Sequence, residues 1–252
     1  MPTVDLPTGI RIRYEEHGPH SGNQSARPLV LAHGGGVSLE MWTPQVRALS
    51  QAHRLVLWDA RGHGGSSVPT DVTSYTMPAM AADLRGLLEA IGAADGAIIG
   101  GMSFGGQIAL QYAVDHPAGT YALVLSDTTT RGEAAAPTGP LGGRMPGGTV
   151  AETWMGEPRV DGRAHAMMTR PDLTPLLPSL AMPALVIVGD DDERILDGLP
   201  RLIDGLSRRR VVRLEGCVHG TSAQRPNDWA FEVLRFLADV EAGAPLGEDE
   251  TV

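Results

Sequence analysis

The segment Gly101–Gly105, with the sequence GMSFG, constrains the fold of this chain more than any other feature. The apolar, β-branched run Ala97–Gly100 precedes it and is typical of a buried strand, whereas a helical pattern begins near Gln107. Ser103 therefore stands at the apex of a predicted strand–turn–helix, the layout of a nucleophile elbow. Because the chain contains 32 glycines, the motif needs support from the other predicted elements.

Predicted strands and helices alternate along most of the chain, and this order favours a mostly parallel sheet with helices on both faces, an α/β fold. We expect strands at 3–6, 10–16, 28–32, 54–59, 97–100, 121–125, 183–189 and 211–214, and helices at 41–51, 77–91, 104–116, 194–206 and 228–240.

The chain divides into a core and an insertion. Residues 1–130 and 183–242 carry the alternating pattern, whereas 131–182 is rich in Gly, Pro, Ala and Met and has weak periodicity. Insertions at the carboxyl ends of parallel strands commonly cover a binding crevice, so we interpret 131–182 as a cap or lid. Residues 243–252 are acidic, and we expect a flexible tail.

The composition excludes several classes of function. The formal net charge of −10 argues against nucleic acid as a partner. All 20 basic residues are arginines, so the chain has no P-loop lysine and no lysine for a Schiff base or pyridoxal phosphate. Cys217 is the single cysteine, which excludes an intramolecular disulfide and a cysteine-rich zinc site.

The same sequence gives expectations for location and partners. The first residues lack the apolar segment of a signal peptide, and no run is long and apolar enough for a membrane span. We expect a cytoplasmic protein that acts on a small molecule, with no nucleic acid, membrane, cofactor or metal. It would be a monomer or a homodimer.

A serine hydroxyl needs a base to attack, and the base needs a carboxylate to orient it. In this layout the three groups follow the order serine, acid, histidine, each just after a strand. Asp192 lies three residues past the end of the strand at 183–189, and His219 follows the strand at 211–214. Asp191 is a neighbouring acid, and Asp127, after the strand at 121–125, is the alternative.

An oxyanion hole needs two backbone N–H groups that point at the oxygen where negative charge develops. The first predicted donor is Phe104, which follows the serine at the start of a helix. The second is Gly35, in the glycine-rich turn after the strand at 28–32. Glycine in this turn allows a close approach of the backbone to a substrate.

Together these segments resemble the α/β-hydrolase fold superfamily, in its compact branch of serine hydrolases that carry a cap. The motifs are His33–Gly35, Asp59–Ser66, Gly101–Gly106, Gly189–Asp192 and His219, and the resemblance extends from about residue 10 to residue 240. It implies a serine hydrolase with a cap over its pocket. Related epoxide hydrolases and haloalkane dehalogenases place aspartate at the apex, so the serine disfavours those activities.

The resemblance implies a carboxylic ester hydrolase or lactonase that forms an acyl-enzyme on Ser103 with a small, largely apolar substrate. Alternatives are hydrolysis of a lactone, enol-lactone or C–C bond, a non-hydrolytic lyase or cyclase, and a ligand-binding receptor on the same fold. His33 and His63 lie in family loops and are expected to bridge backbone groups, and Cys217 is expected to be a small buried residue.

Large apolar side chains of the insertion have two interpretations. Their plainest role is packing against the core, and they would also suit a pocket for an apolar substrate. The candidate pocket residues are Trp42, Met145, Trp154, Met155, Met167 and Met168.

Overall fold

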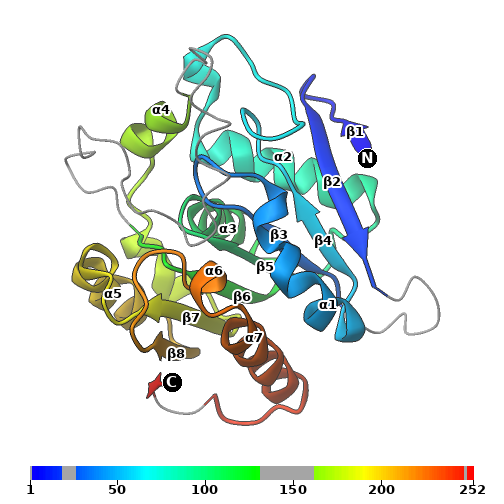
Figure 1. The fold of residues 1–252 in the computed structure, drawn as a ribbon. Coiled ribbons are helices and arrows are strands. Elements are labelled where there is room, and N and C mark those ends of the chain that lie inside the picture. The colour runs from blue at the N-terminus through cyan, green and yellow to red at the C-terminus, as the bar shows by residue number, and fades with distance from the viewer. Residues whose placement is uncertain (1, 19–26, 131–161, 247–248) are drawn as a thin grey trace.

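In the described part of the chain, nine strands form one sheet at the centre of the molecule (Figure 1). The structure is a computed structural model that describes residues 2–18, 27–130, 162–246 and 249–252. Its strands are β1 (Thr3–Asp5), β2 (Arg11–His17), β3 (Leu29–Ala32), β4 (Leu55–Trp58), β5 (Ala97–Met102), β6 (Thr120–Ser126), β7 (Ala184–Gly189), β8 (Arg209–Leu214) and β9 (Glu250–Thr251).

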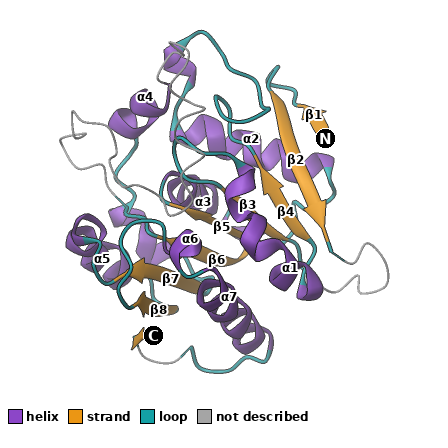
Figure 2. Cartoon of the chain, viewed as in Figure 1, coloured by secondary structure: helices purple, strands orange, loops and turns teal. Residues whose placement is uncertain are grey.

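Helices flank the sheet on both faces (Figure 2). They are α1 (Thr43–Ala52), α2 (Met77–Ala90), α3 (Phe104–Asp115), α4 (Gly162–Thr169), α5 (Glu193–Gly205), α6 (Thr221–Gln224) and α7 (Pro226–Glu241), with 3₁₀ turns at Leu39–Trp42, Val72–Ser74, Pro117–Gly119 and Thr174–Ser179.

The strand order is β1-β2-β4-β3-β5-β6-β7-β8-β9. β1 pairs antiparallel with β2, and β2 antiparallel with β4, whereas every pairing from β4 through to β9 is parallel. Strands β3, β4, β5 and β7 are buried at every residue, as strands covered on both faces must be. The α/β prediction with a mostly parallel sheet is confirmed.

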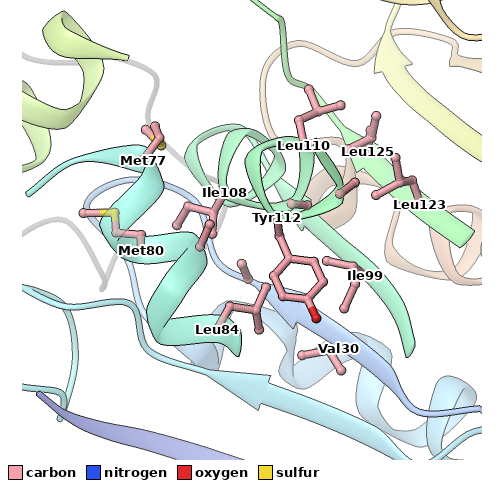
Figure 3. Packing of buried hydrophobic residues seen from close by; sticks show 14 of the residues in the cluster. Val30, Met77, Met80, Leu84, Ile99, Ile108, Leu110, Tyr112, Leu123 and Leu125 are labelled. Atoms are coloured by element: carbon pink, nitrogen blue, oxygen red, sulfur yellow. The ribbon is translucent and has the colours of Figure 1, made fainter. Parts of the chain in front are cut away.

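Alternate residues of each strand fill two hydrophobic cores. Val30 and Ile99 face the helices α2 and α3, where they meet Leu84, Ile108 and Tyr112 (Figure 3). On the opposite face the strands pack against α1 and α7, which lie side by side. The sheet is thus covered on both faces, and the loops that leave its carboxyl edge carry the candidate site.

The end of the chain differs from the expected flexible tail. Glu250 pairs with Val212 of β8, and the backbone N–H of Glu215 donates to the carbonyl oxygen of Val252 at 2.9 Å. Arg235 on α7 also forms an ion pair with Glu250 at 2.5 Å. A two-residue strand has no room for an alternating pattern, so the sequence does not predict β9.

The predicted cap falls mostly outside the described residues, which resume at Gly162, so the domain division remains a prediction. The described part of the insertion contains α4 and the 3₁₀ turn at Thr174–Ser179. Ala166 and Leu177 from these two elements are fully buried in the same core as α2 and α3. The end of the insertion is thus packed onto the main domain.

Candidate active site

Ser103 lies at a sharp turn between β5 and α3. Its backbone dihedral angles are φ 52° and ψ −110°, a conformation that costs a non-glycine residue about 1–3 kcal/mol. The turn is held because the N–H of Ser103 donates to the carbonyl oxygen of Ser126 at 2.8 Å. A Cβ atom at Gly101 would clash with the backbone of Gly105, and one at Gly105 would clash with the carbonyl of Ala32. The two glycines of the motif therefore allow this tight turn.

The acid and the histidine meet at the carboxyl edge of the sheet. Nδ1 of His219, after β8, lies 2.7 Å from Oδ2 of Asp192, which follows β7 and precedes α5. The Asp192 side chain is buried, whereas 31% of the His219 side chain is exposed. The neighbouring acids are placed differently, since Asp190 accepts the N–H of Gly216 at 2.7 Å and Asp191 is exposed. Of the three acids, Asp192 is the one that contacts His219.

The loops of the acid and the histidine are joined to each other. The N–H of Asp191 donates to the carbonyl oxygen of Cys217 at 2.9 Å, and Cys217 is buried as expected. Gln224 of α6 donates through Nε2 to the carbonyl oxygens of Val218 at 2.9 Å and His219 at 3.1 Å. Sequence reasoning missed Gln224 because no motif marks it, and its contact depends on the short helix α6.

Asp127 occupies a different position from Asp192. It is fully buried, and its Oδ2 accepts the N–H of Thr221 at 3.0 Å, the hydroxyl of Thr221 at 2.8 Å and that of Ser126 at 3.0 Å. Burial raises the pKa of Asp127, and the nearby charge of His219 acts in the opposite direction. Asp127 thus anchors the start of α6, directly after the histidine loop, and the geometry favours Asp192 as the partner of His219.

The glycine turn after β3 lies next to the start of α3. A Cβ atom built on Gly35 would lie 3.4 Å from the Cβ atom of Phe104. On either side of Gly35, the N–H of Gly34 donates to Sδ of Met41 at 3.1 Å and the N–H of Gly36 to Nε2 of His63 at 3.4 Å. The N–H of Phe104 belongs to the first turn of a helix, whose N–H groups have no partner within the helix. The two predicted oxyanion donors are therefore neighbours.

Two imidazoles hold this turn, as expected from the sequence. Nε2 of His33 accepts the N–H of Ala60 at 3.1 Å, so its Nδ1 carries the proton and donates to the carbonyl oxygen of Gly34 at 2.7 Å. The rings of His33 and His63 lie 4.7 Å apart between centroids. Burial lowers the pKa of His33 to about 4, and burial together with the neighbouring His33 lowers the pKa of His63 to about 3. Both rings are neutral at pH 7.

These imidazoles make the protein sensitive to acid. An unfolded histidine takes up a proton near pH 6.5, but His33 and His63 stay neutral in the fold until about pH 4 and about pH 3. Their contribution to stability is complete above pH 6.5 and is lost as the pH falls from there toward these values. We expect the free energy of unfolding to fall by about 2 kcal/mol per imidazole between pH 7 and pH 5.

Urea unfolding of the wild type and of His63→Gln at both pH values tests this expectation. The amide of glutamine can still accept the N–H of Gly36, but it does not titrate, so the variant should lose less stability over this interval. Burial raises the pKa of the buried carboxyls Asp83 and Asp127, which act in the opposite direction in both proteins. Equal losses in the two proteins would contradict the role of His63.

The candidate pocket residues are only partly placed. Trp42 is fully buried and packs on Trp229, with 5.0 Å between ring centroids, in the core beneath α1 and α7. Met167 is partly buried against the core of α2 and α3, whereas Met168 is 77% exposed. Met145, Trp154 and Met155 lie outside the described residues. The pocket lining therefore remains a prediction, and Trp42 has the packing role.

Within the described ranges, no group of three or more His, Cys, Asp or Glu side chains is arranged to hold a metal ion. In the same part of the chain, no helix has the length and apolar character needed to cross a membrane.

Comparison with known proteins agrees with this fold. A family model described as alpha/beta hydrolase fold matches residues 27–147. A non-heme chloroperoxidase of Streptomyces lividans is 28% identical over an alignment that covers 94% of this chain and 99% of the relative. The structure of a thermophilic esterase from Thermogutta terrifontis, with malate bound, has a TM-score of 0.80 and 25% identity and covers 95% of this chain and 99% of that one.

An enol-lactonase from Burkholderia xenovorans has the same TM-score of 0.80 and 25% identity, and the match covers 94% of this chain and 100% of that one. The fold, the elbow and these relatives lead to one conclusion. The chain belongs to the α/β-hydrolase fold superfamily and is a hydrolase of that fold.

Proposed function

We propose that this protein hydrolyses a carboxylic ester-like bond of a small, largely apolar substrate through an acyl-enzyme on Ser103. The observation that carries the proposal is the hydrogen bond of 2.7 Å between His219 Nδ1 and Asp192 Oδ2. It occurs at the same edge of the sheet as a serine in a strained strand-to-helix turn. A buried carboxylate, an oriented imidazole and a nucleophile elbow are together the components of a catalytic triad.

In the first half of the reaction, Oγ of Ser103 attacks the carbonyl carbon while Nε2 of His219 takes the hydroxyl proton. Asp192 accepts the N–H at Nδ1 and stabilises the imidazolium that forms. The N–H groups of Gly35 and Phe104 donate to the tetrahedral oxyanion. The bond to the leaving group then breaks, and His219 gives its proton to the departing oxygen.

In the second half, water replaces the leaving group. His219 takes a proton from the water, whose oxygen attacks the carbonyl carbon of the acyl-enzyme. The same two N–H groups stabilise the second oxyanion. Collapse of this intermediate returns the proton to Ser103 and releases the carboxylic acid. No step calls for a cofactor or a metal ion.

A lactone is a second candidate substrate, because the enol-lactonase relative matches nearly the whole of this chain. A lactone is a cyclic ester, so the same attack opens the ring and leaves the alcohol on the acyl group. A panel that pairs open-chain esters with lactones of similar size distinguishes the two by their kcat/KM values.

The proposal is tested by labelling the purified protein with a fluorophosphonate probe and by measuring hydrolysis of short p-nitrophenyl esters. We expect one label per chain, found on the peptide that contains Ser103 by mass spectrometry, and turnover that the label abolishes. Labelling of Ser103 without turnover would indicate a binding protein on this fold. A label on another residue with full turnover would contradict the proposed nucleophile.

A further inference from the structure

The thioether of Met41 holds the turn that carries the proposed oxyanion donor Gly35. Sδ of Met41 accepts the N–H of Gly34 at 3.1 Å. On the other side of Gly35, the N–H of Gly36 donates to Nε2 of His63 at 3.4 Å. The two N–H groups that flank Gly35 in the chain are thus bound to side chains, and one of the two acceptors is a sulfur atom that a peroxide can oxidise.

The backbone on both sides of Met41 is held by the fold, so the sulfur lies at a defined place. Met41 belongs to the 3₁₀ turn Leu39–Trp42, in which Leu39 and Trp42 are buried. The N–H of Leu39 donates to Oδ1 of the buried Asp59 at 2.7 Å. Met41 itself is only partly buried and packs against the core of α1 and α7. A small oxidant therefore has access to this side chain, whereas its neighbours in the turn stay in place.

A second thioether limits the space around Gly34. A Cβ atom built on Gly34 would lie 2.8 Å from Sδ of Met102, which directly precedes Ser103 and is 4% exposed. Because Met102 is buried in the core of α1 and α7, it leaves Gly34 little room to move. A displacement that begins at Met41 is therefore passed along the turn to Gly35.

Oxidation of the thioether to the sulfoxide changes the contact with Gly34 in either of two ways. If the new oxygen takes the lone pair that accepts the N–H, it stands between the sulfur and the nitrogen and pushes the turn away. If it takes the other lone pair, the sulfur becomes electron-poor and the N–H loses its acceptor. The sulfoxide is also a polar group placed against an apolar core. In each case the turn moves, and the N–H of Gly35 moves with it.

We propose that Met41 is a site of reversible oxidative modification, at which a peroxide forms the sulfoxide, displaces Gly35 and lowers ester hydrolysis. The O–O bond of hydrogen peroxide breaks and an S–O bond forms, so that the sulfur loses two electrons and water leaves. Methionine sulfoxide reductases reverse the change. The proposal rests on the proposed function, in which the N–H of Gly35 binds the oxyanion. Because a misplacement of about 1 Å costs up to about 100-fold in rate, we expect kcat to fall at least about tenfold.

The test treats the purified protein with hydrogen peroxide for increasing times, stops the reaction with catalase, and measures kcat on a short p-nitrophenyl ester. Peptide mass spectrometry gives the oxidised fraction of each methionine in the same samples. We expect the lost fraction of kcat to follow the oxidised fraction of Met41, and the two reductases specific for the sulfoxide epimers to restore activity. Full kcat in protein oxidised at Met41, or a Met41 that the peroxide leaves unmodified, would overturn the proposal.

Met41→Leu is the specific variant, since leucine has a similar size and no sulfur to oxidise. Met182→Leu is the matched control, because Met182 is a buried core methionine that precedes β7, at the opposite edge of the sheet. Each protein is compared with its own untreated sample. Met41→Leu should keep its kcat through the treatment, and Met182→Leu should lose as much as the wild type. An equal fractional loss in Met41→Leu and the wild type, or protection in Met182→Leu alone, would overturn the proposal and leave the proposed function intact.

Failure of the proposed function gives a different result, which is no ester hydrolysis by the untreated wild type. The turn is then measured directly, by hydrogen exchange of the peptide that spans residues 33–41 before and after oxidation, in the wild type and in Met41→Leu. Faster exchange in the oxidised wild type alone would support displacement of the turn through Met41, and any other result would overturn it.

Discussion

Ser103→Ala is expected to lower kcat for ester hydrolysis by about a millionfold, because the acyl-enzyme cannot form without the hydroxyl. The small rate that remains comes from the oxyanion donors and from substrate binding, which the substitution leaves in place. Alanine removes only the side-chain hydroxyl and keeps the backbone N–H that donates to the Ser126 carbonyl, so the fold should persist. Stopped and continuous assays on a p-nitrophenyl ester, with circular dichroism as the check of folding, measure this effect.

Loss of fluorophosphonate labelling should accompany the loss of activity. Ser222 offers a matched control, because it is a buried serine on α6 close to the histidine loop. The Ser222→Ala protein should still be labelled by the fluorophosphonate probe, and its kcat should keep the same order of magnitude as that of the wild type. A folded Ser103→Ala protein with wild-type turnover would show that another group is the nucleophile.

The second large loss of activity is expected for Asp192→Asn. The amide keeps the shape of the side chain but can donate to Nδ1 of His219, which favours the wrong tautomer of the imidazole and removes the charge that stabilises the imidazolium. We expect kcat to fall by about 10⁴-fold with little change in the unfolding midpoint. Steady-state kinetics from pH 6 to pH 10 measure the loss and show whether a higher concentration of hydroxide restores part of the rate.

Asp191→Asn and Asp127→Asn are the comparisons that make this result specific. Asp191 is exposed and one residue away, so its substitution should leave kcat unchanged. At Asp127, the amide oxygen of asparagine can still accept the N–H of Thr221, and we expect a loss of less than about tenfold. A larger loss in Asp127→Asn than in Asp192→Asn would assign the acid to Asp127 instead.

Much of the fold is predictable from hydrophobic periodicity. The expected helices and strands of the core end within about two residues of the observed ones, because α2, α3 and the parallel strands are strongly patterned. The elements α4, α6 and β9 are not predicted. Helix α6 and strand β9 are too short to carry a period, and α4 lies in an insertion whose periodicity is weak. Their positions depend on tertiary contacts, such as the pairing of Glu250 with Val212.

The candidate site shows the same division. The order of Ser103, Asp192 and His219 follows from where strands end, and this can be read along the chain. The different placement of the neighbouring acids cannot be read in this way, because Asp190 and Asp191 have the same chemistry as Asp192 and only the structure shows where each side chain points. The approach of Arg163 to Gly35 is likewise a tertiary contact between segments that share no motif. Trp42 is a candidate pocket residue in the sequence because an aromatic side chain suits a pocket and a core equally well, and the structure buries it in the core.

The last strand of the sheet has a consequence for the histidine loop. Val252 accepts the N–H of Glu215 at 2.9 Å and is also bound by Nη1 of Arg225 at 3.1 Å, on the two sides of the loop that carries His219. If β9 separates from β8, the N–H of Glu215 and the guanidinium of Arg225 lose this acceptor together. We therefore expect the edge of the sheet and the loop of the proposed base to open together in local unfolding, so that residues remote in sequence affect the order of the imidazole.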